Sequence, residues 1–142
     1  MTTEFTGSCL CGAVSYKASA APQLGGHCHC VDCRKSSGTG HCSHAVMKAD
    51  DVTIEGEPVK FDKPADSGNI VSRFFCGTCG GPVYSTNSGM PGMTFLRASS
   101  LDDPEVFTAN MIVYTRGAPS WDVMDPELPG FETMPPQMPE GM

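Results

Sequence analysis

Seven of the eight cysteines in this 142-residue chain fall into three tight groups. The groups are Cys9-Leu10-Cys11, Cys28-His29-Cys30-Val31-Asp32-Cys33 and Cys76-Gly77-Thr78-Cys79. Thiolates so close together can bind one soft cation, and zinc takes four of them in the closed sites that stabilise folds. Seven thiolates fill one closed site and leave a second site one ligand short. Since an open zinc position can take part in chemistry, the count predicts one structural and one catalytic zinc.

The first and third groups have the form of zinc-binding turns. Each ends on a glycine, Gly12 or Gly80, and glycine supplies the positive φ that such a tight turn often needs. One zinc bound by both groups would join two distant stretches of the chain, so its role would be structural. The alternative is that these cysteines are buried and bind no metal, and this alternative is weak for Cys76 and Cys79. It is less weak for Cys9 and Cys11 taken alone.

The second group provides three thiolates, from Cys28, Cys30 and Cys33. In an extended run His29 would point away from its two neighbours, so we do not expect it to bind the same metal. Water, a substrate thiol or a distant side chain would be the fourth ligand. Cys42 and His44 are the distant candidates, and either one would turn this second site into a purely structural one.

Further polar side chains lie close to the second group in sequence. Arg34 and Lys35 follow it directly, and in an acidic protein they predict a rim that binds a substrate carboxylate. A solvated charged turn is the alternative, and Arg73 and Arg97 are weaker candidates for the same role. We expect the four histidines, His27, His29, His41 and His44, to support metal ligands and not to act as catalytic bases.

These groups must be positioned by a chain rich in turns. Its 16 glycines and 12 prolines favour short strands over helices. Strands are predicted at 13–17, 42–47, 52–55, 70–75, 83–86, 93–98 and 106–114. A helical turn is predicted only at 31–37, with Asp32 as N-cap. The pattern therefore predicts a mainly β domain over residues 1–124. A proline-rich tail over residues 125–142 would wrap the surface and fray at its end.

Composition and charge exclude several classes of function. The net charge of −7 argues against nucleic acid or an anionic membrane as the main partner. We expect neither a secretory signal nor a membrane span, because no segment has the required apolar run. Paired cysteines at metal-ligand spacing then indicate a reducing, cytoplasmic location. The sequence does not indicate the oligomeric state.

Five stretches of the sequence together form a specific pattern. They are Gly7 to Tyr16, Cys28 to Gly38, Arg73 to Gly81, Ser100 to Pro104 and Ala118 to Asp122. In order and spacing they resemble the glutathione-dependent formaldehyde-activating enzyme family, over about Gly7 to Pro129. The resemblance implies an antiparallel, Mss4-like β fold with two zinc ions per chain. By position, the structural zinc would be bound by Cys9, Cys11, Cys76 and Cys79, and the catalytic zinc by Cys28, Cys30 and Cys33.

The family's named reaction joins glutathione and formaldehyde into S-hydroxymethylglutathione, a carbon–sulfur lyase reaction run in reverse. The resemblance thus implies a detoxifying, zinc-dependent enzyme acting on adducts of glutathione, or a similar thiol, with formaldehyde or another small electrophile. We expect the thiol to occupy the open zinc position, which lowers its pKa, and Arg34 or Lys35 to hold its carboxylate. The alternatives are a non-catalytic, zinc-stabilised binding or scaffold domain, and a redox or metal-storage role of exposed thiolates.

Overall fold

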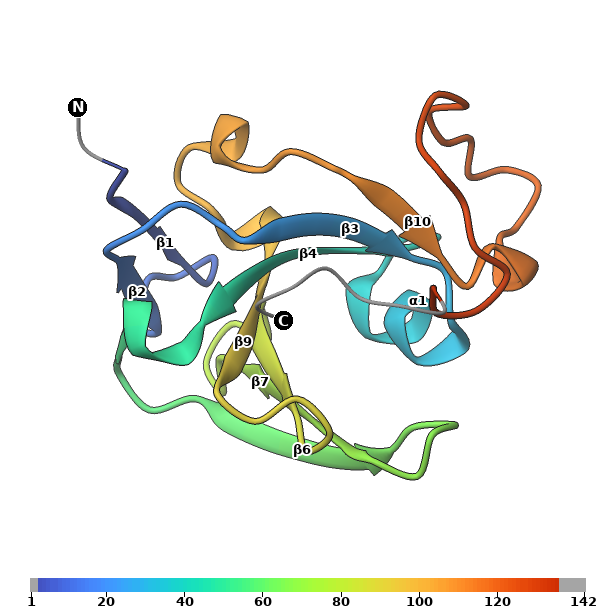
Figure 1. The fold of residues 1–142 in the computed structure, drawn as a ribbon. Coiled ribbons are helices and arrows are strands. Elements are labelled where there is room, and N and C mark those ends of the chain that lie inside the picture. Colours follow the sequence, from blue (N-terminus) through green and yellow to red (C-terminus); the bar gives the residue numbers. More distant parts are fainter. Residues whose placement is uncertain (1–2, 136–142) are drawn as a thin grey trace.

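A computed structural model describes residues 3–135, which form ten strands, one short α-helix and four 3₁₀ turns (Figure 1). The strands are β1 (Phe5–Ser8), β2 (Ser15–Ala18), β3 (Leu24–Cys28), β4 (Cys42–Lys48), β5 (Val52–Glu55), β6 (Val59–Pro64), β7 (Ile70–Phe75), β8 (Pro82–Asn87), β9 (Met93–Arg97) and β10 (Met111–Val113). The helix is α1 (Val31–Ser37), and the 3₁₀ turns are η1 (Ala49–Asp51), η2 (Ala98–Ser100), η3 (Pro104–Val106) and η4 (Thr115–Gly117). The predicted mainly β fold class is confirmed.

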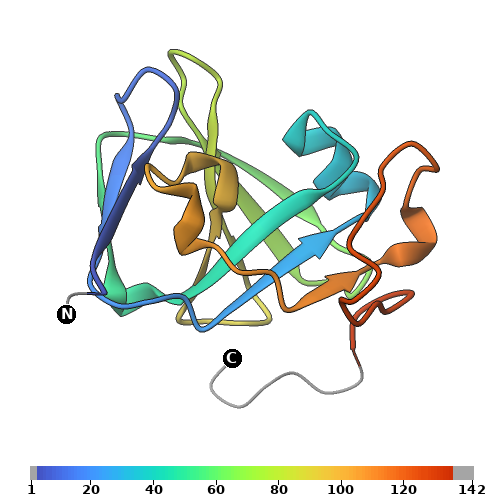
Figure 2. The same ribbon diagram turned by 90° about the horizontal axis from the view of Figure 1, so that it is seen from above.

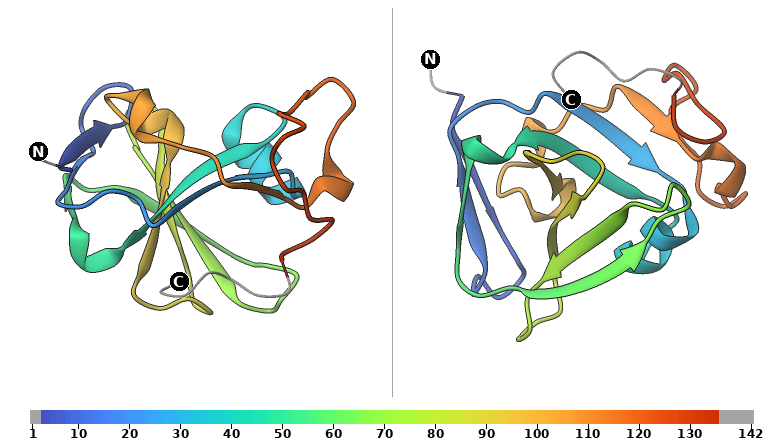
Figure 3. Two further views of the ribbon diagram at one scale, coloured as in Figure 1. Left: turned by 45° about the horizontal axis from the view of Figure 1, so that its top comes forward. Right: turned by 60° about the horizontal axis from the view of Figure 1, so that its bottom comes forward.

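The strands are arranged in two sheets. The larger has seven strands in the order β10-β3-β4-β9-β8-β7-β6, and the smaller has three in the order β1-β2-β5. All pairs are antiparallel, as expected, apart from β10, which runs parallel to β3. The large sheet curls strongly, so that the β6–β7 hairpin returns towards α1 (Figures 2 and 3). Lys63 on β6 there forms an ion pair with Asp32 on α1 at 3.0 Å.

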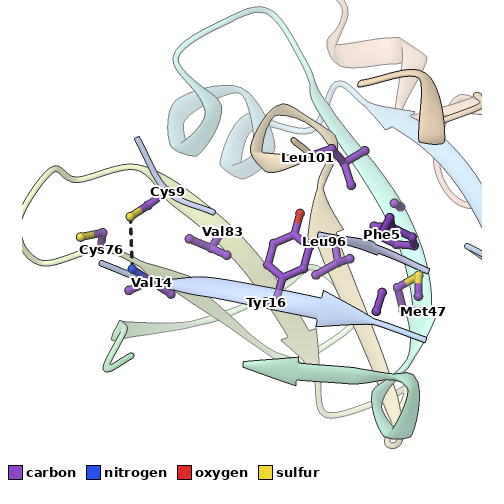
Figure 4. Close-up of a cluster of buried hydrophobic side chains, with 11 residues drawn as sticks. Phe5, Cys9, Val14, Tyr16, Met47, Cys76, Val83, Leu96 and Leu101 are labelled. Carbon is purple, nitrogen blue, oxygen red and sulfur yellow. Dashed lines mark hydrogen bonds between the residues drawn. The ribbon is translucent and has the colours of Figure 1, made fainter. Parts of the chain in front are cut away.

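The main apolar core lies where the small sheet covers the large one (Figure 4). Residues of β1 and β2 alternate between buried and outward positions, which is the period of two that a half-buried strand requires. The buried members are Phe5, Cys9, Val14, Tyr16, Ala18, Ala45, Met47, Cys76, Val83, Leu96 and Leu101. Two cysteines of the predicted structural zinc site therefore belong to the core itself.

The described part of the predicted tail runs along β10. Backbone hydrogen bonds of 2.9 Å join Ile112 to Pro129 and to Phe131. The Phe131 ring packs against a second buried cluster that contains Cys28, Cys33 and other residues. The segment lies on the surface, as expected, but it is not extended throughout, because it contains turns, bends and a single bridge residue, Gly130. The fraying expected at the end of the tail falls on 136–142, outside the described residues, and the domain boundary stays a prediction. Among the described residues there is no helix with the length and apolar character needed to cross a membrane.

Tyr16 is the largest fully buried side chain of the core. Its hydroxyl lies 2.7 Å from Ser100 Oγ, and because the Ser100 hydroxyl donates to the Arg97 carbonyl, Tyr16 donates to Ser100. Gly7, the cross-strand neighbour of Tyr16, leaves the space for this ring, since a Cβ at Gly7 would overlap the Tyr16 hydroxyl. Burial raises the pKa of Tyr16 to about 12, from an ordinary value of 10.0.

A Tyr16→Phe substitution should therefore lower the free energy of unfolding by about 1 kcal/mol at neutral pH, the usual worth of one hydrogen bond. The native state keeps the Tyr16 proton where the unfolded chain loses it, so the stabilisation is complete below pH 10 and is lost as the pH rises towards 12. Urea denaturation of both proteins at about pH 8 and about pH 11 should show the difference between them shrinking. A difference independent of pH would contradict this account.

Candidate metal centres and the adjoining cavity

The structure brings together the four cysteines expected to bind the structural zinc. The sulfur atoms of Cys9, Cys11, Cys76 and Cys79 all lie within 4.8 Å of one another. Sγ of Cys11 is 3.7 Å from Sγ of Cys9 and 3.6 Å from Sγ of Cys76. Four sulfurs each about 2.3 Å from one zinc in a tetrahedron stand about 3.8 Å apart. The spacing thus fits a closed tetrahedral zinc site.

Backbone amides point at these sulfurs. The N–H groups of Thr78 and Cys79 donate to Cys76 Sγ over 3.3 and 3.5 Å and lower the pKa of the Cys76 thiol. The N–H groups of Cys11 and Gly81 act in the same way on Cys79 and lower its pKa to about 6. Cysteine binds metals as the thiolate, so this turn prepares the sulfurs for a cation.

The second group gathers three sulfurs where β3 passes into α1. Sγ of Cys28, Cys30 and Cys33 all lie within 4.8 Å of one another. Cys28 ends β3, and Cys30 is the N-cap of α1, with its sulfur accepting the N–H of Cys33 over 3.2 Å. The predicted N-cap, Asp32, lies in the first turn instead, since the Cys30 sulfur takes the capping role. One helical turn returns Cys33 to the other two sulfurs.

Neither Cys42 nor His44 joins these three sulfurs within 4.8 Å, in the part of the chain that the structure describes. Cys42 is buried on β4 opposite Cys28. His44 Nε2 lies 3.6 Å from Cys33 Sγ, and His44 Nδ1 lies 3.0 Å from Nη1 of Arg97. An arginine N–H only donates, so Nδ1 accepts and the ring proton sits on Nε2. In this tautomer His44 donates to the Cys33 sulfur and has no lone pair with which to bind a metal there.

A cavity of about 520 Å³ opens beside Cys28, Cys30 and Cys33. Three cationic side chains, Lys63, Arg73 and Arg116, line it. Lys63 pairs with Asp32 at 3.0 Å, and Arg116 pairs with Asp66 at 3.6 Å. Arg73 makes no ion pair with a described residue, and its Nε is buried without a hydrogen-bond partner there. The cavity therefore contains one guanidinium group that is available to an anionic or carbonyl ligand.

Arg34 and Lys35, the residues expected to hold a substrate carboxylate, lie on α1 beside Cys33. The cavity wall takes Val31, Asp32 and Cys33 from this helix and, as far as described residues define it, neither of the two cations. Their role in substrate binding stays a prediction, and the wall offers Lys63, Arg73 and Arg116 as further cations.

Tyr114 is a wall residue that sequence reasoning missed. Its backbone is left-handed, with φ 57° and ψ 41°, at the N-cap of η4. For a residue other than glycine this conformation costs on the order of 1 kcal/mol or more, and such residues cluster at functional sites. Burial, and then the negative charge of Asp66, raise the pKa of the phenol, which is a hydrogen-bond donor at neutral pH. No local sequence signal marks a left-handed tyrosine.

Comparisons with known proteins agree with this geometry. No curated protein matches the chain. A crystal structure of a Rhodobacter sphaeroides protein is similar, with 19% sequence identity over 88% of this chain and 98% of that one and a TM-score of 0.54, which shows a shared fold. Residues 4–117 match the family model described as glutathione-dependent formaldehyde-activating enzyme. This match spans all three cysteine groups, and the chain therefore belongs to the glutathione-dependent formaldehyde-activating enzyme family.

Proposed function

We propose that the chain is a zinc-dependent carbon–sulfur lyase acting on adducts of glutathione, or a similar thiol, with formaldehyde or another small electrophile. The supporting observation is that Cys28, Cys30 and Cys33 open onto a cavity of about 520 Å³. This volume lies within the range of small-molecule sites. A scaffold domain stabilised by zinc would need neither the open side nor the cavity.

A zinc ion bound by these three thiolates would accept the substrate thiol as its fourth ligand and lower the pKa of that thiol. A buried cation is linked to these sulfurs through His44. Arg97 is 2% exposed and donates to His44 and to Ser85 Oγ, the latter at 3.3 Å. A buried guanidinium needs a counter-charge, and a cluster of three thiolates around one zinc, with a net charge of about −1, supplies it.

Two donors on the cavity wall suit the second half of the reaction. When the thiol sulfur bonds to the carbonyl carbon, the C=O π bond breaks and the oxygen takes a negative charge and then a proton. Arg73 and the hydroxyl of Tyr114 line the cavity and can donate a hydrogen bond to that oxygen. Formaldehyde is so reactive that holding it beside the sulfur supplies most of the required acceleration.

The finer properties of this proposal follow from the same chemistry. We expect two zinc ions per chain, one at each cysteine group, and a cytoplasmic role in formaldehyde detoxification. Arg34 and Lys35 stay our candidates for holding a carboxylate of the thiol at the mouth of the site. The only partner we propose is the thiol substrate, because the net charge of −7 disfavours nucleic acid.

Exchange NMR of glutathione and formaldehyde, with and without protein, tests the activity directly. We expect the wild type to accelerate exchange over the uncatalysed reaction. Cys30→Ser should keep the fold. Its catalysed exchange rate should fall by more than roughly 10–100-fold, which is the usual loss when a residue that hydrogen-bonds to a metal ligand is removed. If wild-type protein contains two zinc ions and does not accelerate the exchange, the enzyme proposal is wrong and the protein is a non-catalytic scaffold domain.

The fourth ligand of the second zinc is tested by metal content. Because His44 donates to sulfur and Cys42 lies outside the group, His44→Gln and Cys42→Ser should both retain two zinc ions per chain by elemental analysis. Cys33→Ser is the matched control, and it should lose one zinc. Loss of a zinc from the His44 or Cys42 variant would mean that the protein itself closes this site.

The structural role of the first zinc is tested by stability. Cys76 is 1% exposed in the core, and structural zinc can supply on the order of 10 kcal/mol of folding free energy. Cys76→Ser should therefore abolish cooperative thermal unfolding followed by circular dichroism. Cys30→Ser, the same exchange at the second group, should melt within a few degrees of the wild type. Equal loss of thermal stability in the two variants would contradict a structural role for the first zinc and a catalytic role for the second.

A further inference from the structure

Two imidazole rings and a carboxylate meet on the other side of the chain from the second cysteine group. Asp122 Oδ2 lies 2.9 Å from His29 Nε2 and 2.7 Å from His41 Nδ1. The three side-chain atoms are all within 4.8 Å of one another. They come from the residue after β3, the residue before β4 and the loop after η4, which lies beside α1 in Figures 1 and 2.

The chain is shaped to let these segments approach. Gly40 precedes His41, and a Cβ at Gly40 would lie 2.6 Å from Oδ2 of Asp122. A Cβ at Gly117 would lie 2.6 Å from the carbonyl oxygen of His29. Neither position has room for a side chain, so these glycines allow the loop after η4 to bring its carboxylate to the two rings.

The His29 ring makes its polar contact within this cluster of His29, His41 and Asp122. It is 1% exposed, and its other nitrogen, Nδ1, is buried without a partner among the described residues. A buried polar side chain normally satisfies all its polar atoms. In His29 the single polar contact of the ring is the one to Asp122, so Nε2 alone accounts for placing a histidine here.

The arrangement has the donors, spacing and charge of a metal site. We propose that His29, His41 and Asp122 form a third metal site, which binds a divalent first-row transition-metal ion through two imidazole nitrogens and one carboxylate oxygen. Ligands about 2.1 Å from one ion stand roughly 3 Å apart at the right angles of an octahedral site and roughly 3.4 Å apart in a tetrahedral one, so the observed 2.7 and 2.9 Å would widen by a few tenths of an ångström as an ion binds. Two neutral imidazoles and one carboxylate carry a charge of −1. Such nitrogen and oxygen donors suit zinc, cobalt or nickel.

The site differs in access and chemistry from the cysteine groups. The side chains of Asp122 and His41 are 15% and 24% exposed, which admits a small ion and water from solvent. On binding, the proton that each ring now donates to Asp122 would move to the other nitrogen of the same ring, so that both imidazoles stay neutral and no proton is lost from them. No sulfur takes part, so an ion here would have a different spectrum from one held by thiolates. This site is independent of the proposed function, because its ligands do not line the cavity in the described structure.

His27 supplies a matched control. Its ring centroid lies 4.9 Å from that of His41, and its Nδ1 is hydrogen-bonded to Ser43 Oγ at 2.8 Å. It belongs to no group of three metal-ligating atoms among the described residues. An effect on metal binding that requires His41 and Asp122 but not His27 is therefore specific to the proposed ligands.

The test is equilibrium dialysis of the zinc-loaded protein against Co²⁺, followed by elemental analysis and absorption spectroscopy. We expect one cobalt ion per chain in addition to two zinc ions, with no thiolate-to-cobalt charge-transfer band. His41→Gln and Asp122→Asn should weaken cobalt binding by about tenfold or more, and His27→Gln should leave it unchanged. The melting temperature in the absence of cobalt establishes that each variant is folded.

Three results would overturn the proposal. The first is a wild type that takes up no third ion, which would make the cluster a hydrogen-bonded clamp on the loop. The second is equal cobalt binding by folded wild type and His41→Gln. The third is cobalt uptake with a charge-transfer band and loss of zinc, which would place the ion at a cysteine group.

Discussion

The fold depends on the meeting of two distant turns at four sulfur atoms. Cys9 and Cys11 lie between β1 and β2, and Cys76 and Cys79 lie between β7 and β8. Among residues 3–135 no ladder joins the two sheets, and the isolated bridge of Gly7 on β1 is to Leu101, which follows β9 and η2. The small sheet is therefore held by the apolar core and by this sulfur cluster, whose Cys9 and Cys76 are core residues (Figure 4). A metal ion bound by these four sulfurs would cross-link the sheets at the edge of the core.

The geometry of the second cysteine group is determined by strand pairing in the large sheet. Strand β3 is paired on both sides, by β4 and β10, which fixes Cys28. His44 on β4 and Arg97 on β9 are register partners, and this pairing places the guanidinium behind the imidazole that faces Cys33. The hydrogen-bond chain from Arg97 to Cys33 thus crosses two strands. Hence sheet register places the Arg97 guanidinium against Nδ1 of His44, and this contact directs the ring N–H at Nε2 towards Cys33.

Sequence reasoning succeeded where the determinant is local and failed where it is tertiary. The cysteine spacings and the positive φ of Gly12 and Gly80 depend on a few adjacent residues, and all are observed as predicted. Strand β3 is absent from the predicted strands because it contains two consecutive glycines, Gly25 and Gly26, and glycine is depleted in strands. A Cβ at Gly25 would overlap the backbone carbonyl oxygen of Thr108, a contact invisible in sequence. The left-handed Tyr114 likewise has long-range contacts, because its N–H donates to the carbonyl oxygen of Thr133 and its side chain packs against the second buried cluster.

The two cysteine groups have different surroundings, although backbone N–H groups donate to a sulfur in both. Around the first group, backbone N–H groups donate to the sulfurs. These peptide groups have no net charge, so they do not attract an anionic ligand. Around the second, the protein places Arg97 and Arg73, although its net charge is −7. Surface charges are screened beyond about 8–10 Å at physiological salt, so a cationic cavity can attract an anionic thiol despite an acidic surface. This asymmetry favours chemistry at the second group and a structural role for the first.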